Sequence, residues 1–103
     1  MRSGDVYWGV TSAAGERPYL IITRSAAIAV LDRITVVPCS TRIRGIPTEL
    51  PLGREVGLDH ESVAQLDSVM PAMKSSLHRH LGTLGPDAHA DLCRRLAIAF
   101  GCD

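Results

Sequence analysis

Short apolar runs separated by turn-forming residues dominate most of the chain. Residues 19–23 form a continuous apolar run, which is typical of a strand buried on both faces, whereas residues 62–69 have mixed faces. Two boundaries are placed at prolines, because proline lacks the N–H that a strand ladder uses: Pro18 begins one strand and Pro38 ends another. The pattern predicts strands over residues 4–10, 19–23, 34–37, 48–50, 62–69 and 77–84.

Near the end of the sequence, the hydrophobic residues recur instead at the spacing of an amphipathic helix. Pro86 and Asp87 suit its first turn, since proline's missing N–H is not needed there and a carboxylate favours the positive end of the helix dipole. Gly101 suits the position just after the last turn. The expected apolar stripe consists of Ala88, Leu92, Leu96 and Ala99 or Phe100.

We therefore expect a helix from residue 86 to about residue 100, and one or two helical turns over residues 25–30. Several short strands followed by one terminal helix predict an α+β fold, with a strongly curved antiparallel sheet or a small barrel. We expect residues 1–103 to form a single domain.

Composition and charge narrow the class of protein. With 46% hydrophobic residues and no net charge, the chain is typical of a small folded domain and not of a disordered one. Residues 1–54 carry a net charge of +3 and residues 55–103 a net charge of −3, and ten of the eleven bases are arginine. This clustering favours a polyanionic partner, although a GC-rich genome explains arginine-rich usage equally well. Since no apolar run approaches the roughly 18 residues of a membrane span, and the N-terminus lacks a signal-like segment, we predict a cytoplasmic protein that does not contact membranes.

Histidine and cysteine give no recognisable metal motif. His78 and His80 would share one face of a strand, and His89 and Cys93 would be neighbours on the helix. Neither a Cys-x-x-Cys nor a His-Glu-x-x-His spacing is present, so we predict no metal and no cofactor. Cys39 follows a proline at a strand exit, but no paired base can be identified, and we interpret it as a structural thiol.

Two short polar segments carry the most informative side chains. Glu16 and Arg17 come directly before an apolar strand, and residues 40–44 supply two hydroxyls and two guanidiniums. Metal-free cleavage of RNA needs a cation for the phosphate oxygens, a hydrogen-bond donor to the same oxygens, and a proton donor for the leaving 5′ oxygen. A solvated connecting loop often has the same composition, so composition alone leaves both interpretations open.

Several short motifs follow one another along nearly the whole chain. They are GDVYW at 4–8, ERP at 16–18, TVVPCSTRIRGIPTE at 35–49, GLD at 57–59, SVAQLD at 62–67, KSSL at 74–77 and GTL at 82–84. Their order resembles the MazF/PemK family of toxin endoribonucleases. The resemblance implies an SH3-like barrel of the PemK/CcdB type with a C-terminal helix, a homodimer, and sequence-specific, metal-independent cleavage of single-stranded RNA. Attack by the ribose 2′-OH would leave 2′,3′-cyclic phosphate and 5′-OH ends.

The same resemblance assigns roles to individual residues. Arg17 matches the family's reactive arginine and is expected to act as general acid and phosphate ligand. Ser40 stands where the family usually has threonine and is expected to stabilise the oxyanion. Either Glu16 or Asp67 would be the base or would orient Arg17. The residues expected to contact RNA are Glu16, Thr41, Arg42, Arg44, Gln65 and Asp67.

Two departures from the family prevent the target sequence from being copied from relatives. The segment from Val10 to Arg17 is shorter than the flap of many members. After Asp67, where many relatives read Gln-Ile-Arg-Thr, this chain reads Ser68-Val69-Met70-Pro71. The arginine at that place is therefore missing.

The resemblance also implies a partner, a MazE-like antitoxin whose acidic, disordered tail blocks the RNA site. The +3 half of the chain gives such a tail a reason to bind. The alternative is a non-catalytic toxin or an RNA- or antitoxin-binding module on the same fold, as in the gyrase-poisoning toxins.

Overall fold

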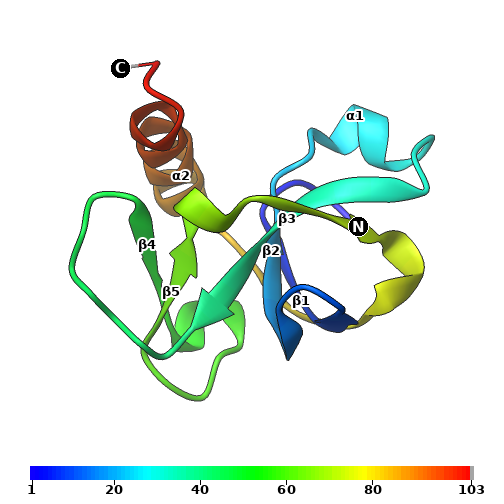
Figure 1. The fold of residues 1–103 in the computed structure, drawn as a ribbon, viewed down its shortest axis with the longest axis horizontal. Helices are drawn as coiled ribbons and strands as arrows, with labels where there is room; N and C mark the ends of the chain where they lie inside the picture. Colours follow the sequence, from blue (N-terminus) through cyan, green and yellow to red (C-terminus); the bar gives the residue numbers. More distant parts are fainter. Residues whose placement is uncertain (103) are drawn as a thin grey trace.

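The computed structural model describes residues 1–102 as an antiparallel sheet with a long C-terminal helix (Figure 1). The strands are β1 (Asp5–Thr11), β2 (Gly15–Ile21), β3 (Arg33–Ser40), β4 (Glu49–Leu52), β5 (Ser62–Gln65), β6 (Met70–Met73) and β7 (Leu77–Thr83). The helices are α1 (Ser25–Ile28) and α2 (Pro86–Ala99), with 3₁₀ turns η1 (Arg54–Val56), η2 (Leu66–Ser68) and η3 (Lys74–Ser76). The predicted α+β fold with a C-terminal helix is confirmed.

The sheet is curved but open. Its strand order is β4-β5-β3-β2-β1-β7, and every pairing is antiparallel. On the side away from β2, β3 pairs first with β6 and then, through Cys39 and Ser40, with β5. The segment after β4 returns to contact β7, yet within residues 1–102 the outer strands β4 and β7 do not pair. The expected barrel is therefore not closed.

Glycine makes the close approach between η1 and β7 possible. A Cβ added at Gly82 would lie 2.4 Å from the backbone carbon of Val56, and one at Gly57 would lie 2.1 Å from the carbonyl oxygen of Leu81. Gly57 also has a positive φ of 81°, which side chains other than glycine rarely adopt. These two glycines let the segment after β4 lie directly on the far strand of the sheet.

We expect Gly82→Ala to destabilise the fold by about 1–3 kcal/mol, because the added methyl group forces two backbones apart. Urea unfolding of the purified protein measures this change. Gly85→Ala is the control, since nothing lies within 4 Å of a Cβ built there; because Gly85 is the N-cap residue of α2, this change should cost at most about 1 kcal/mol. If the two variants are equally stable, the contact between η1 and β7 accommodates the added methyl group without loss of stability.

Two apolar clusters cover the two faces of the sheet. Leu20 of β2 packs in the cluster beneath α2, whereas its neighbours Tyr19 and Ile21 pack in the cluster beneath α1. This alternation confirms that residues 19–21 are buried on both faces. Leu92 anchors α2 in the first cluster, and Ala88, Leu96 and Ala99 pack around it, whereas Phe100 is 61% exposed.

Two predicted boundaries at prolines are wrong for one physical reason. Pro18 lies inside β2, opposite Trp8 of β1 but beyond the last residue that pairs with β3. Pro38 lies inside β3, opposite Tyr19 of β2 but between the residues that pair with β6 and those that pair with β5. Each proline thus has one unpaired edge, where a missing N–H costs no ladder bond, and the strands continue through them.

The strand predicted over residues 62–69 is also wrong in extent. β5 ends at Gln65, the turn η2 follows, and a separate strand β6 begins at Met70. β6 was not predicted because proline, here Pro71, is disfavoured in a strand that is paired on both edges. Within residues 1–102, β6 pairs only with β3, so a proline is tolerated at its other edge. No helix within residues 1–102 is long and apolar enough to cross a membrane.

Candidate active site

Arg17 and Ser40 lie at the end of the ladder between β2 and β3. The last pair of this ladder is Tyr19 and Pro38, and Arg17 and Ser40 stand two residues beyond it at matching positions of the two strands, without being paired with each other. The two candidate catalytic residues, 23 positions apart in the sequence, thus come to matching positions of neighbouring strands.

Arg17 borders a solvent-filled hollow of about 440 Å³. The hollow is lined by Ala13, Ala14, Arg17, Pro38, Gln65, Ser68 and Met70. Ser40 is not among the residues that line it. The Nε atom of Arg17 is buried and has no hydrogen-bond partner among the residues that the structure describes. Buried polar groups are nearly always paired, and a guanidinium binds phosphate oxygens through paired donors. An anionic ligand in the hollow would supply the missing partner.

The hydroxyl of Ser40 accepts a hydrogen bond from the backbone N–H of Arg42 at 3.1 Å. This bond uses a lone pair of the oxygen and leaves the hydroxyl proton free to be donated. It also fixes the hydroxyl at the strand end. Ser40 can therefore donate to a phosphate oxygen without first breaking a bond.

Neither candidate acid contacts Arg17. Glu16 is adjacent to Arg17 on β2 and so points to the opposite face, where its Oε1 accepts a 3.1 Å hydrogen bond from the indole N–H of Trp8. The Oδ2 of Asp67, in η2, accepts a 2.6 Å hydrogen bond from the hydroxyl of Thr48. The structure thus gives both carboxylates other partners than the guanidinium.

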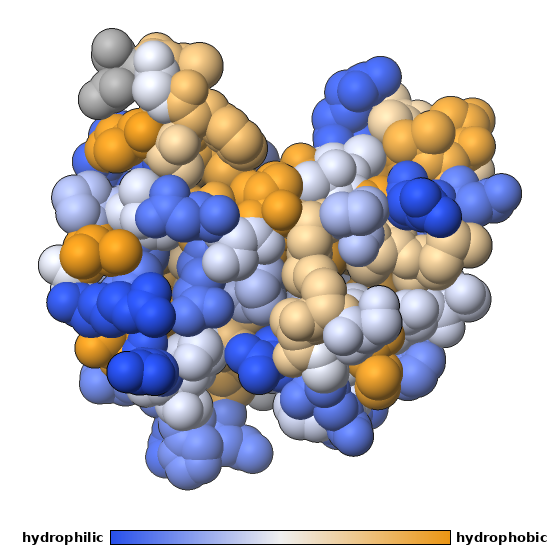
Figure 2. Space-filling view, in the orientation of Figure 1, coloured by the Kyte–Doolittle hydropathy of each residue, from blue (hydrophilic) through white to orange (hydrophobic). Residues whose placement is uncertain are grey.

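The β3–β4 loop (residues 41–48) carries the remaining predicted RNA contacts. Thr41, Arg42 and Arg44 are exposed on it, and Ile43 between the two arginines is 51% exposed. In Figure 2 the side of the molecule that carries this loop shows strongly hydrophilic and hydrophobic side chains next to one another. Two guanidiniums close to Ser40 make this edge of the site cationic.

Glu49 binds the backbone of this loop through its carboxylate, a role that was not predicted from the sequence. Its side chain is buried, and Oε1 accepts 2.9 Å hydrogen bonds from the backbone N–H groups of Arg44 and Gly45. Its Oε2 has no partner within residues 1–102. A glutamate after several loop residues is normally an exposed strand residue, so nothing in the sequence indicated that it is buried.

Ser68 and Met70 are also in the hollow beside Arg17 and were not predicted as site residues. They occupy the positions where the sequence departs from the family after Asp67, which is the signal that could have identified them. Gln65 lies in the same hollow, half-buried, as expected for a residue that contacts a ligand.

Cys39 is buried next to the site. Burial raises the pKa of its thiol to about 12, while a backbone hydrogen bond involving Leu20 and the charge of Arg17 lower it in part. A protonated, inaccessible thiol is a poor nucleophile. This supports the interpretation of Cys39 as a structural residue.

We therefore expect Cys39 to resist alkylation in the native protein, whereas the exposed Cys93 and Cys102 react with iodoacetamide at pH 8. Peptide mass spectrometry after labelling measures each site, and labelling in urea provides the control in which all three react. Rapid native labelling of Cys39 would contradict its burial.

The histidines are spread over the surface. His78 and His80 are exposed on β7, and His89 is half-buried on α2. Within residues 1–102, no three His, Cys, Asp or Glu side chains converge in a way that could hold a metal ion.

Comparison with known proteins identifies the family of the chain. Residues 2–100 match the family model described as the PemK-like, MazF-like toxin of type II toxin–antitoxin systems. The chain belongs to this toxin family. Its predicted family resemblance is thereby confirmed.

Individual relatives cover almost the whole toxin chain. The probable endoribonuclease MazF5 of Mycobacterium tuberculosis is 36% identical over 102 residues, which is 96% of this chain and 92% of the relative. The solved structure of the Mycobacterium tuberculosis toxin MazF-mt6 superposes with a TM-score of 0.89 at 29% identity, covering 96% and 98% of the two chains. A mycobacterial endoribonuclease in complex with its cognate antitoxin has a TM-score of 0.88 at 26% identity, covering 100% and 97%.

Proposed function

We propose that this protein is an endoribonuclease toxin that cleaves single-stranded RNA at a specific sequence without a metal ion. The observation that supports the proposal most is Arg17, which borders a hollow and whose Nε has no partner within residues 1–102, with Ser40 at the matching position of β3 two residues beyond the last β2–β3 pair. Relatives named as endoribonucleases support the same activity.

In the proposed reaction the ribose 2′-OH attacks the adjacent phosphorus. The new 2′-O–P bond forms as the P–O5′ bond breaks, giving a 2′,3′-cyclic phosphate. Arg17 binds the phosphate oxygens and gives a proton to the leaving 5′ oxygen, and Ser40 donates a hydrogen bond to a non-bridging oxygen. The proton of the 2′-OH passes to solvent. Glu16 and Asp67, which have other partners, then act as RNA contacts.

Substrate binding is assigned to the rim of the hollow. Arg42 and Arg44 on the β3–β4 loop bind the phosphates flanking the cleaved bond, and Thr41 donates from the same loop. The Gln65 amide, beside Arg17, has both donors and acceptors with which to read a base edge.

The proposal includes an antitoxin as the physiological partner. A related mycobacterial structure contains an endoribonuclease with its cognate antitoxin. An acidic, disordered tail would be attracted by Arg17, Arg42 and Arg44 and would block the RNA site. The complex and the free toxin are both assigned to the cytoplasm.

We further propose that the toxin is a homodimer. Val30, which follows α1, is 81% exposed, and Leu31 and Met73 beside it are exposed too. Figure 2 shows hydrophobic surface gathered over α1. Sedimentation equilibrium distinguishes a dimer from an 11.1 kDa monomer.

Growth of bacteria that express the protein tests the function against its alternative. The nuclease predicts growth arrest with fragmented RNA for the wild type, and normal growth with intact RNA for Arg17→Ala. Arg79→Ala, which removes an exposed arginine on β7, should remain toxic and serves as the control. Toxicity that survives Arg17→Ala, with intact RNA, would contradict the proposal and indicate a non-catalytic toxin such as a gyrase poison.

A further inference from the structure

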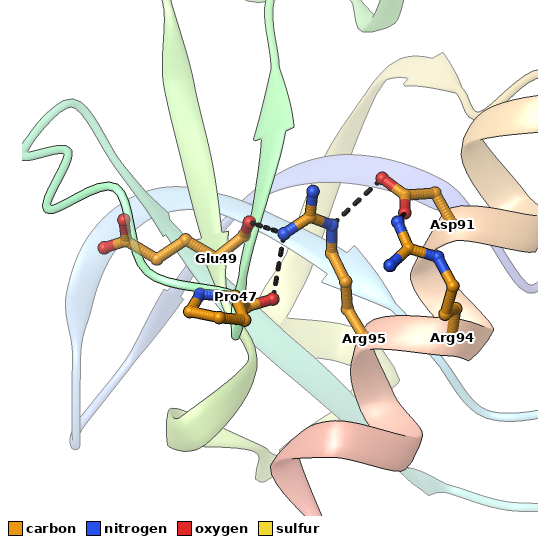
Figure 3. Close-up of polar contacts among 5 residues, drawn as sticks. All are labelled: Pro47, Glu49, Asp91, Arg94 and Arg95. Carbon is orange, nitrogen blue, oxygen red and sulfur yellow. Dashed lines mark hydrogen bonds and ion pairs between the residues drawn. The ribbon is translucent and has the colours of Figure 1, made fainter. Parts of the chain in front are cut away.

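Helix α2 reaches the rim of the proposed active site through Arg95. Its Nη1 donates hydrogen bonds to the carbonyl oxygens of Pro47 and Glu49, at 2.9 and 3.1 Å, across 48 and 46 positions of sequence (Figure 3). Its Nε donates a 3.0 Å hydrogen bond to Oδ2 of Asp91, one turn earlier on the helix. One guanidinium therefore joins the helix to the end of the β3–β4 loop.

Asp91 keeps this guanidinium in place. The hydrogen bond from Arg95, followed by the charges of Arg95 and Arg94, holds the pKa of Asp91 below its usual range, so the carboxylate stays ionised at neutral pH. Arg94 pairs with the other oxygen of Asp91 (Figure 3). Arg94, however, makes no hydrogen bond to the loop within residues 1–102, although it borders the same hollow as the loop residues Ile43 and Pro47.

Other hydrogen bonds of the β3–β4 loop lie at its two ends. The N–H of Arg42 donates to Oγ of Ser40, and Thr48 accepts a backbone bond from Leu66 and donates its hydroxyl to Asp67. Residues 41–47 are all exposed, so apolar burial cannot set their position.

The carboxylate of Glu49 binds the N–H groups of Arg44 and Gly45 on the inner side, and Arg95 binds two carbonyls on the helix side. Hydrogen bonds with charged groups are the stronger ones in proteins. These two side chains thus form a clamp at the loop's C-terminal end.

We propose that Arg95 is a positioning residue, which fixes the β3–β4 loop so that Arg42 and Arg44 are ready to bind RNA before the substrate arrives. This inference rests on the proposed function, because it assigns the loop arginines to the substrate. Arg95 itself does not reach the reacting atoms. Its loss raises the cost of ordering the loop on binding, which weakens substrate binding more than it slows the chemical step.

The fold does not depend on this contact. Leu92, Leu96 and Ala88 pack α2 against the sheet, and none of them requires the guanidinium of Arg95. Arg95→Ala should therefore fold, and Arg95→Lys provides a milder variant that keeps a cation and donors at the same place. Arg94→Ala is the matched control. It removes the same charge at the adjacent position, from a side chain that pairs with the same carboxylate, Asp91.

Hydrogen exchange of the Arg44 and Gly45 amides, measured by NMR without RNA, tests the clamp directly. Arg95→Ala should accelerate their exchange about tenfold, the change expected for losing one hydrogen bond to a charged donor, with an intermediate rate for Arg95→Lys. Arg94→Ala should leave the rates unchanged. Equal exchange in Arg95→Ala and the wild type would overturn the inference, whether or not the protein cleaves RNA.

Steady-state cleavage supplies the functional half of the test. Arg95→Ala should raise KM about tenfold and change kcat less than about twofold, with partial recovery in Arg95→Lys. An equal rise in KM for Arg94→Ala would overturn the inference, because it would show a general charge effect. Absence of cleavage by the wild type would instead reject the proposed function, and the exchange measurement would still decide whether the clamp exists.

Discussion

Replacing Arg17 with alanine should reduce RNA cleavage by at least about 10³-fold, because one side chain supplies both the phosphate ligand and the proton donor. The loss should appear in kcat, since the charge on the phosphate oxygens grows in the transition state. Single-turnover cleavage of a defined single-stranded RNA measures it. Gel filtration and circular dichroism establish that the variant is folded.

Arg17→Lys separates charge from geometry. Lysine keeps the positive charge but cannot provide the paired, planar donors of a guanidinium, so we expect it to recover only a small part of the rate. Arg79→Ala, on β7, controls for the loss of one positive charge and should cleave normally. If Arg17→Ala keeps more than about a tenth of the wild-type rate, the assignment of Arg17 to the reaction is wrong.

Ser40→Ala should slow cleavage about 10²-fold, the usual effect of removing one donor to a developing oxyanion. Ser40→Thr should stay within about fivefold of the wild type, because threonine provides the same hydroxyl at the same strand end. The comparison is informative because the Ser40 oxygen accepts a hydrogen bond from the Arg42 N–H, which leaves the hydroxyl proton available to a phosphate oxygen.

Thr41→Ala is the control for a neighbouring hydroxyl on the loop, and we expect a smaller effect there. The same single-turnover assay measures all three variants. Equal rates for Ser40→Ala and the wild type would remove Ser40 from the mechanism, and the oxyanion would then depend on Arg17 alone.

Much of the fold could be predicted because its hydrophobic pattern is strong. The strand predicted over residues 19–23 is correct for its buried part, residues 19–21, although β2 ends at Ile21, and the stripe through Leu92 on α2 was predicted correctly. The errors occur at Pro18, Pro38 and Pro71, where a local rule was applied without knowledge of the neighbouring strands. Whether a proline ends a strand depends on which of its two edges is paired, and only the sheet order decides that.

The site was predicted less completely than the fold. The motifs suggested Arg17 and Ser40, whose roles stay predictions, and their matching positions two residues beyond the Tyr19–Pro38 pair depend on a register that no local pattern encodes. The clamp on the β3–β4 loop was not predicted, because Arg95 and Pro47 are 48 positions apart. Glu16 was expected close to Arg17, but adjacent residues of a strand point to opposite faces, and Glu16 binds Trp8 instead.

The central claim is that this fold cleaves RNA with arginine and hydroxyl groups alone. The most direct measurement is to incubate the purified protein with long single-stranded RNA in EDTA and to identify both ends of every fragment. The account predicts cuts at one short sequence, each leaving a 2′,3′-cyclic phosphate and a 5′-OH. RNA that stays intact with the folded protein, across messenger, transfer and ribosomal substrates, would contradict it, as would fragments with 5′-phosphate ends.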